Sequence, residues 1–306
     1  MRIAALALAS VLSAQAGTYY VTVAGLGGEP EYETRFTGLA TDIDKLLKSS
    51  SGATRVETLS GPNATKARFT EVVSNMAKSM TAQDALVVML IGHGTFDNID
   101  YKFNVVGPDI SANDLSDLLD RVPGQQMVSI MTSASGGAVP LLKKDGRAVI
   151  TATKSGTEKN AVAFSRYWAE ALRDPAADAD KNEIVSALEA YRYAADKTAR
   201  FYETSKHIAT EHAQIIDTSK GDPVRDPSPA NGQGLLASRF ALLRLGAVQK
   251  AAGTPEKQAL LQKKESIEQE IAKLKYQKAA MNPDEYRRKL ADLLLQLSRT
   301  QTELEK

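Results

Sequence analysis

The amino-acid sequence predicts an α/β protein with a mostly parallel sheet flanked by helices, followed by a C-terminal antiparallel helical hairpin. Two apolar runs, 86–91 and 127–131, are continuous enough to be strands buried on both faces, and glycine-flanked polar residues follow each of them. Strand-like and helix-like stretches alternate around these runs, as they do in α/β proteins. From residue 254 onwards, leucine and isoleucine instead recur at helical spacing among lysine, glutamate and glutamine.

The first half of the predicted domain alternates strands with helices. Residues 18–24 are rich in β-forming side chains and stop at Gly25, and further strands are expected at 55–59 and 85–91. Between these strands, apolar residues recur at three-to-four spacing and predict two helices. The two apolar faces are Phe36, Leu39, Ile43, Leu46, Leu47 and Phe69, Val72, Val73, Met76, Met80. This alternation implies right-handed crossovers and a parallel sheet.

Helix caps and later strands complete the predicted α/β domain, which spans residues 17–216. Thr65 is expected to cap the second helix, and Ser111 a third helix with Asp114 in its first turn. The remaining strands are expected at 101–106, 127–131 and 147–153.

The region after this domain divides into three parts. Residues 217–234 are rich in proline and glycine and predict a linker, and residues 235–253 form an amphipathic connecting segment. Residues 254–306 carry two amphipathic stripes, with Asn282-Pro283 starting the second helix, and predict a helical hairpin. The hairpin either folds onto its own domain or forms a coiled-coil-like contact with a second copy or a partner. The length of the stripes favours self-association or partner contact.

Composition excludes some functions. The chain has 306 residues, a net charge of +1 and no cysteine. The near-neutral charge gives no indication of nucleic-acid binding, which is usually accompanied by a basic excess. No apolar run approaches the roughly 18 residues that would span a bilayer, so no membrane span is expected. Without cysteine no disulfide can form.

Residues 1–16 have the three parts of a secretory signal peptide. Arg2 provides the positive start, residues 3–12 the apolar region, and Ala14-Gln15-Ala16 the small-residue cleavage site. The alternative is a first buried strand or helix of the mature fold. The order of the three parts favours export, with Gly17 as the mature start and a periplasmic or secreted location.

Two polar residues follow the two central strands. His93 lies in Gly92-His93-Gly94, and Ser133 follows the next main strand in Thr132-Ser133-Ala134-Ser135-Gly136. Because the carboxyl ends of parallel strands meet at one edge of a sheet, His93 and Ser133 are expected to lie close together there.

These motifs resemble the legumain-like and caspase-like cysteine peptidases, in which a His-Gly after one strand faces an Ala-Cys-x-Ser-Gly after the next. Ser133 stands where that family has its nucleophilic cysteine. The resemblance implies a caspase-like fold, a catalytic role for His93, and an oxyanion hole built from the backbone amides of Gly94 and Ser133. Tyr32 and Arg35 match a legumain loop, and this similarity implies that Arg35 lines a substrate-binding pocket.

The serine changes the expected activity. A thiol has a pKa of about 8.5 and readily forms a thiolate beside an imidazole, whereas a serine hydroxyl needs a base held in position by a third group. We therefore expect a peptidase homologue that is inactive or weakly active, requires no cofactor, and binds a peptide or protein partner. The alternatives are an active hydrolase with a Ser133–His93 dyad, and a cysteine peptidase in a nucleophile-replaced form.

A second motif occupies residues 178–189 and resembles an EF-hand loop. Asp178, Asp180, Asn182 and Glu189 provide oxygen atoms at the spacing that wraps Ca²⁺. Glu183 stands where such a loop needs glycine, so the backbone there is expected to be strained. Weak Ca²⁺ binding is one expectation. The other is a solvated acidic turn that caps the next helix.

Overall fold

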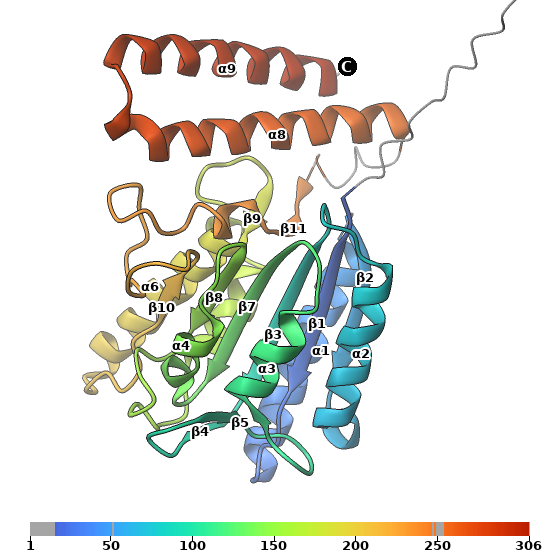
Figure 1. The fold of residues 1–306 in the computed structure, drawn as a ribbon, viewed down its shortest axis with the longest axis vertical. Helices are drawn as coiled ribbons and strands as arrows, with labels where there is room; N and C mark the ends of the chain where they lie inside the picture. Colours follow the sequence, from blue (N-terminus) through green and yellow to red (C-terminus); the bar gives the residue numbers. More distant parts are fainter. Residues whose placement is uncertain (1–15, 51, 247, 249–253, 306) are drawn as a thin grey trace, which may run out of the picture.

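The computed structural model describes residues 16–50, 52–246, 248 and 254–305. The predicted signal peptide therefore lies outside the described residues, except for its last position. Figure 1 shows an α/β domain with a helical hairpin lying across one end. Among the described residues, no helix is long and apolar enough to cross a membrane.

The centre of the domain is a six-stranded sheet with the strand order β10-β8-β7-β3-β1-β2. Neighbouring strands are parallel, except that β10 runs antiparallel to β8. The strands are β1 (Thr18–Ala24), β2 (Ala53–Leu59), β3 (Ala85–Gly92), β7 (Gln125–Thr132), β8 (Arg147–Thr151) and β10 (Gln214–Ile216). The predicted α/β class with a mostly parallel sheet is confirmed.

Strand β3 shows why the central strands read as continuous apolar runs. Its side chains point alternately to the two faces, so Val87 and Ile91 join one core while Val88 and Leu90 join the other. Both faces are covered, and every one of these side chains is fully buried. A strand between two helical layers has no solvent-facing positions that would need polar residues.

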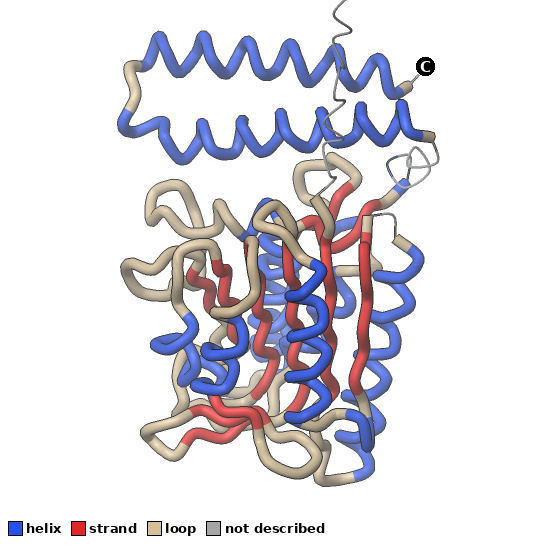
Figure 2. The backbone as a smooth tube through the Cα atoms, turned by 45° about the vertical axis from the view of Figure 1, so that its right-hand side comes forward, coloured by secondary structure: helices blue, strands red, loops and turns tan. Residues whose placement is uncertain are grey.

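Helices cover both faces of the sheet, as Figures 1 and 2 show. One face packs against α1 (Pro30–Ser49), α5 (Phe164–Ala171) and α6 (Ala187–Ser205). The opposite face packs against α2 (Lys66–Ser79), α3 (Ala112–Leu119) and α4 (Val139–Leu142). Right-handed crossovers that run in two directions along a sheet place helices on both of its faces.

Local sequence signals set the helix starts. The Thr65 hydroxyl accepts a hydrogen bond from the Arg68 amide, and Ser111 forms a reciprocal capping box with Asp114. The side chain of Asn282 caps the last helix. These three predicted caps are confirmed, because such caps depend only on residues within one turn.

Two small sheets and several short 3-10 helices complete the domain. The antiparallel sheet β4-β5-β6 lies where β3 ends, and β9 pairs antiparallel with β11. These strands are β4 (Gly94–Phe96), β5 (Tyr101–Phe103), β6 (Ile110–Ser111), β9 (Ile184–Ser186) and β11 (Ala241–Arg244). The 3-10 helices are Gly61–Asn63, Ser135–Ala138, Pro175–Ala177, Ala237–Arg239 and Lys278–Ala280.

The C-terminal hairpin consists of α8 (Pro255–Gln277) and α9 (Pro283–Leu304). The two helices run antiparallel, and α8 lies between α9 and the domain (Figures 1 and 2). This confirms the predicted antiparallel hairpin. Helix α8 contacts the domain through both apolar and polar groups. Leu261 packs in a small buried cluster with Ile184 of β9. Glu265 pairs with Arg244 at 2.9 Å, and the Tyr276 hydroxyl donates to the Gln233 carbonyl at 2.7 Å.

The segment 217–234, which the sequence predicts to be a linker, lies against the domain. Its first residue, Asp217, is buried and accepts hydrogen bonds from the amides of Gly234, Leu236 and Ala237 at 2.7–3.1 Å. Val224, in its middle, forms two backbone hydrogen bonds with Ile215 of β10. Both contacts tie the segment to the edge of the sheet.

Candidate active site

The carboxyl ends of β3 and β7 bring the two predicted catalytic residues to one edge of the sheet. These strands are parallel neighbours, with Gly92 opposite Thr132. His93 and Ser133 are the next residues of the two strands. In Figure 1 both strands run downward to the end of the domain where β4 and β5 lie.

The same edge contains the point where the strand order reverses. Strand β1 has β2 on one side and β3 on the other. The helix after β1 covers one face of the sheet, and the helix after β3 covers the other. The connections therefore diverge at the ends of β1 and β3, where open α/β sheets usually bind ligands.

The Ser133 hydroxyl is buried and bonded to the peptide groups of Gly94. It donates to the Gly94 carbonyl at 2.9 Å and accepts from the Gly94 amide at 3.1 Å. Only 3% of Ser133 is exposed. The hydroxyl proton is thus directed to a carbonyl oxygen, and the amide predicted for the oxyanion hole already has a partner.

Gly94 allows this close approach because it has no side chain. A β-carbon at this position would lie 2.5 Å from the Ser133 carbonyl oxygen and 2.6 Å from the Tyr101 ring. Real β-carbons essentially never come so close to other atoms. The glycine of the His-Gly pair is therefore required by packing in this protein, whatever its chemical role.

His93 has mostly aromatic neighbours. Its half-buried ring makes edge contacts with Tyr32 and Phe36, at centroid distances of 4.6 and 5.0 Å. Burial lowers the pKa of the His93 imidazole, and the positive charge of Arg35 lowers it further. A hydrogen bond with the Gly27 backbone opposes this shift but does not cancel it. The imidazole is therefore neutral at pH 7, the form in which it can accept a proton.

Arg35 lies beside this ring cluster. Its guanidinium carbon is 4.6 Å from the centre of the Tyr32 ring and 5.5 Å from that of Phe36, so the arginine makes cation–π contacts. The structure therefore brings His93 and Arg35 together around Tyr32 and Phe36. Arg35 is exposed and can reach a ligand at the carboxyl edge.

The turn after Ser133 is held by residues that the sequence analysis missed. Ala134 has a φ of +56°, and its amide donates to the Glu158 carbonyl at 2.7 Å. The Gly136 amide donates to the Thr153 hydroxyl at 3.0 Å. Both partners belong to the segment after β8, and no local pattern in that segment marks them.

The predicted metal-binding loop places three carboxylates together. Ligand oxygens of Asp178, Asp180 and Glu189 lie within 4.8 Å of one another. These groups also stabilise the conformation of the loop. The Asp178 carboxylate accepts hydrogen bonds from the backbone amides of Asn182 and Glu183. Burial raises the pKa of both Asp180 and Glu189. The cluster therefore binds protons more readily than isolated carboxylates do.

Asn182 and Glu183 occupy the middle of this loop. The Asn182 side-chain oxygen accepts a hydrogen bond from the Ile184 amide at 2.8 Å, and this bond stabilises the backbone of the loop. Glu183 has a φ of +67°, which is the left-handed conformation that the EF-hand comparison predicts for this position. In this conformation a residue with a β-carbon has a higher backbone free energy than glycine has.

Helix α8 extends the acidic cluster from outside the motif. Burial raises the pKa of Glu268 to about 7, although Lys264 opposes the shift, and the carboxylates of Asp180 and Glu265 add to it. The Asn182 amide group lies 3.4 Å from the Glu268 carboxylate. Because α8 follows about seventy residues later in the chain, the motif itself gives no signal of Glu268.

Comparisons with known proteins give similarity of fold only. No family model matches the sequence, and no curated protein matches it. A solved structure from Geobacter sulfurreducens is 11% identical, over 76% of this chain and 100% of that chain, with a TM-score of 0.47. Caspase-1 from Spodoptera frugiperda is 13% identical, over 68% and 88%, with a TM-score of 0.46. The Drosophila initiator caspase Dronc is 10% identical, over 73% and 84%, with a TM-score of 0.43.

Proposed function

We propose that this chain is a caspase-like peptidase homologue that does not turn over peptides and acts as a binding or assembly module. The family assignment rests on the His-Gly and Ser-x-Ser-Gly motifs at neighbouring strand ends. The loss of turnover rests on one observation, the pair of hydrogen bonds between the Ser133 hydroxyl and the Gly94 backbone.

The chemical argument concerns the serine proton. A serine nucleophile must pass its proton to a base during attack, so its hydroxyl is expected to donate to an imidazole. Here the hydroxyl donates to the Gly94 carbonyl, which is no base at neutral pH. Breaking the bond to the Gly94 carbonyl adds to the barrier of attack, and each 1.4 kcal/mol added to the barrier costs about tenfold in rate.

The carboxyl edge retains features that suit binding. Arg35 is exposed beside the Tyr32 and Phe36 rings, and it carries a charge that a carboxylate on a peptide would pair with. We therefore propose that the edge holds a peptide or protein partner without cleaving it.

A second candidate function is hydrolysis by a Ser133–His93 dyad. The lowered pKa of His93 favours it, because a neutral imidazole is the competent base. A third candidate is a natural cysteine peptidase in a nucleophile-replaced form. Both require the residue at position 133 to turn toward His93.

The test is turnover of a mixed peptide library by wild type, Ser133→Cys and His93→Ala. We expect wild type and His93→Ala to give the same background rate. Wild-type cleavage that disappears in His93→Ala would instead establish the serine hydrolase. Turnover that appears only in Ser133→Cys, and is lost when His93→Ala is added, would indicate the nucleophile-replaced peptidase.

Assembly is proposed to involve the outer side of the hairpin. Leu294 and Leu295 on α9 are 49% and 52% exposed. Two adjacent exposed leucines on a helix that faces away from the domain suit contact with a second copy. Light scattering of Leu294→Ser/Leu295→Ser should show a lower apparent mass than wild type. Equal masses would contradict self-association through this face.

A further inference from the structure

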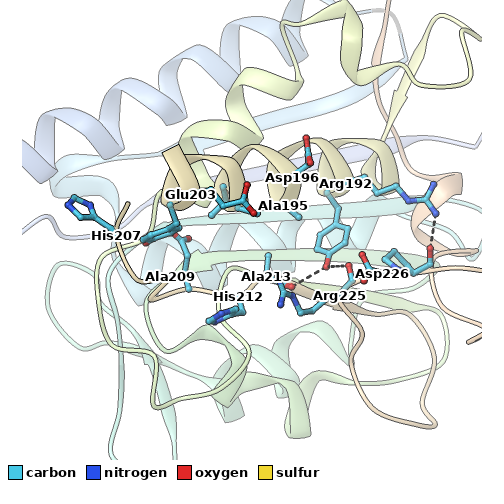
Figure 3. Close-up of a pocket in the computed structure, with 16 residues that line it drawn as sticks. Arg192, Ala195, Asp196, Glu203, His207, Ala209, His212, Ala213, Arg225 and Asp226 are labelled. Carbon is cyan, nitrogen blue, oxygen red and sulfur yellow. Dashed lines mark hydrogen bonds between the residues drawn. The ribbon is translucent and has the colours of Figure 1, made fainter. Parts of the chain in front are cut away.

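The two edges of the central sheet differ in what covers them. At the β10 edge, Ile215 exchanges two backbone hydrogen bonds of 2.8 Å with Val224, from the segment that follows the strand. Beside them, the Tyr191 hydroxyl lies 3.2 Å from the Ala213 carbonyl and 2.8 Å from the Arg225 carbonyl (Figure 3). This edge of the sheet is therefore occupied by the protein's own chain.

The opposite edge is strand β2, and its outer side is open. Strand β2 is the last strand of the sheet and pairs with β1 on its inner side (Figure 1). Within the part of the chain that the structure describes, no backbone hydrogen bond joins the outer side of β2 to another segment. A strand of seven residues with one open side is a surface to which another strand can be added.

The side chains of β2 alternate between the two faces of the sheet. Leu59 joins the core that includes α2, whereas Val56 packs against the core that includes α1. Arg55 and Glu57 are an even number of positions from Leu59, so they share the α2 side. Their side chains are 42% and 28% exposed and pair with each other at 2.8 Å. The open strand therefore presents one positive and one negative side chain on a single face.

The sequence of β2 is chemically symmetric about Val56. Moving outward from Val56, the first two residues are Arg55 and Glu57, and the next two are Thr54 and Thr58. When two copies of this strand pair antiparallel with Val56 opposite Val56, residue 55 of each copy lies opposite residue 57 of the other. Directly opposite residues of an antiparallel pair lie on the same face. Each arginine then faces a glutamate of the second copy, and this contact occurs twice.

Other registers do not give this match. A pair centred on Arg55 places two arginines opposite each other, and a pair centred on Glu57 places two glutamates opposite each other. Opposite charges at facing positions stabilise a strand pair, and like charges destabilise it. Charged side chains on an edge strand also discourage pairing with unrelated strands. The charges of β2 therefore select a second copy of the same strand in one register.

We infer that two copies of this chain associate through β2, with the strands antiparallel about a twofold axis at Val56. The contact continues the sheet of one copy into the next, and both copies use the same surface. This inference goes beyond the proposed function, because it requires neither the carboxyl edge nor the outer side of the hairpin. A protein with two different twofold contacts joins one neighbour through each and forms open chains.

The strength of the contact follows from its size. It consists mainly of one strand from each copy, and small interfaces of this kind are usually transient. We therefore expect a reversible dimer that forms at micromolar protein concentrations rather than a permanent one.

Sedimentation equilibrium of the full chain tests the inference. The parent protein for this test is Leu294→Ser/Leu295→Ser, so that the hairpin face does not contribute. We expect this parent to show a monomer–dimer equilibrium. Arg55→Glu gives each strand two glutamates, and Glu57→Arg gives each strand two arginines. Either change places like charges opposite each other twice, and each should weaken dimerisation by about tenfold or more.

Mixing the two variants gives the sharpest readout. In an equimolar mixture of the Arg55→Glu and Glu57→Arg chains, every glutamate at these positions can face an arginine of the other chain, so dimerisation should return to the parent level. Arg200→Glu and Asp196→Arg provide the matched control, because they make the same charge changes in an exposed ion pair on α6. These two chains should dimerise as the parent does, both alone and mixed.

The double variant Arg55→Glu/Glu57→Arg reverses both charges and keeps the pair within the chain. It should dimerise as the parent does, so a loss in the single variants is not a loss of folding. A parent that stays monomeric at about 0.5 mM protein overturns the inference. Single variants that dimerise like the parent, or a mixture that does not recover, overturn the location at β2. Equal masses of wild type and parent would contradict assembly through the hairpin and leave these results unaffected.

Discussion

The two ends of the sheet are stabilised by different interactions. At the carboxyl end, Ser133 bonds to the Gly94 backbone and His93 packs between aromatic rings. At the amino end, below the hairpin in Figure 1, the acidic loop 178–189 faces the charged side chains of α8. The carboxyl end depends on close packing and neutral hydrogen bonds. The amino end depends on which of its carboxylates carry a proton.

This difference means that the two ends respond to different perturbations. Neutral hydrogen bonds between buried groups do not change with pH or salt, whereas a half-buried carboxylate cluster changes with both. Substitutions that add bulk should therefore perturb the carboxyl end of the sheet. Changes in pH or the addition of cations should perturb the amino end.

The largest effect is expected from Gly94→Ala. The added β-carbon would lie within 2.7 Å of three atoms, two of them on Ser133 and Thr132. We expect a loss of about 3 kcal/mol in the free energy of unfolding, measured by urea denaturation. Gly38→Ala is the control. Gly38 lies in helix α1, and no atom lies within 4 Å of the β-carbon that alanine would add. This substitution should raise the free energy of unfolding by about 0.5–1 kcal/mol. Similar values for both variants would contradict the tight packing at Gly94.

An intermediate effect is expected from Glu268→Gln. The pKa of Glu268 is raised from 4.5 to about 7 mainly by burial, so the folded chain binds this proton more tightly than the unfolded chain. The stability it contributes is fully present below pH 4.5 and is lost as the pH rises through about 7. The substitution should stabilise by about 1–2 kcal/mol at pH 8 and flatten the pH dependence.

Glu270→Gln provides the control for this measurement. Glu270 lies on the same helix, and its side chain is 55% exposed. Its stability profile between pH 4 and 8 should follow that of wild type. A wild-type profile that rises with pH across this window would contradict the account of Glu268.

The smallest effect is expected from Ca²⁺. The Glu189 carboxylate already accepts hydrogen bonds from Ser186 and Ala179, and Asp178 from two amides, so an ion competes with the loop for these oxygens. We expect a Kd on the order of 10⁻⁴ to 10⁻³ M by calorimetry, and no measurable heat for Asp180→Asn. Asp196→Asn, in an exposed ion pair on α6, should bind as wild type does. Micromolar affinity would show that this competition is unimportant.

The sequence predicts the features that depend on neighbouring residues. Strand β3 and the caps at Thr65, Ser111 and Asn282 follow from local patterns, and the left-handed backbone at Glu183 follows from its place in the loop motif. Strand order then places His93 and Ser133 at one edge.

The features that the sequence does not predict join distant segments. The Ser133–Gly94 bonds span 39 positions, and the Asn182–Glu268 contact spans 86. The pairing of β9 with β11 also combines residues from separate parts of the chain. No periodicity or spacing rule links such residues, because their contacts depend on how whole helices and strands pack.

The bonds between Ser133 and Gly94 also have an evolutionary consequence. Sulfur is a weak donor and a weak acceptor, so a cysteine at position 133 would leave both peptide groups of Gly94 poorly satisfied in a buried place. The cost is about 1–3 kcal/mol per unsatisfied group, a large share of the stability of an ordinary domain. A change from serine to cysteine would then need compensating substitutions around Gly94, which makes this serine difficult to replace.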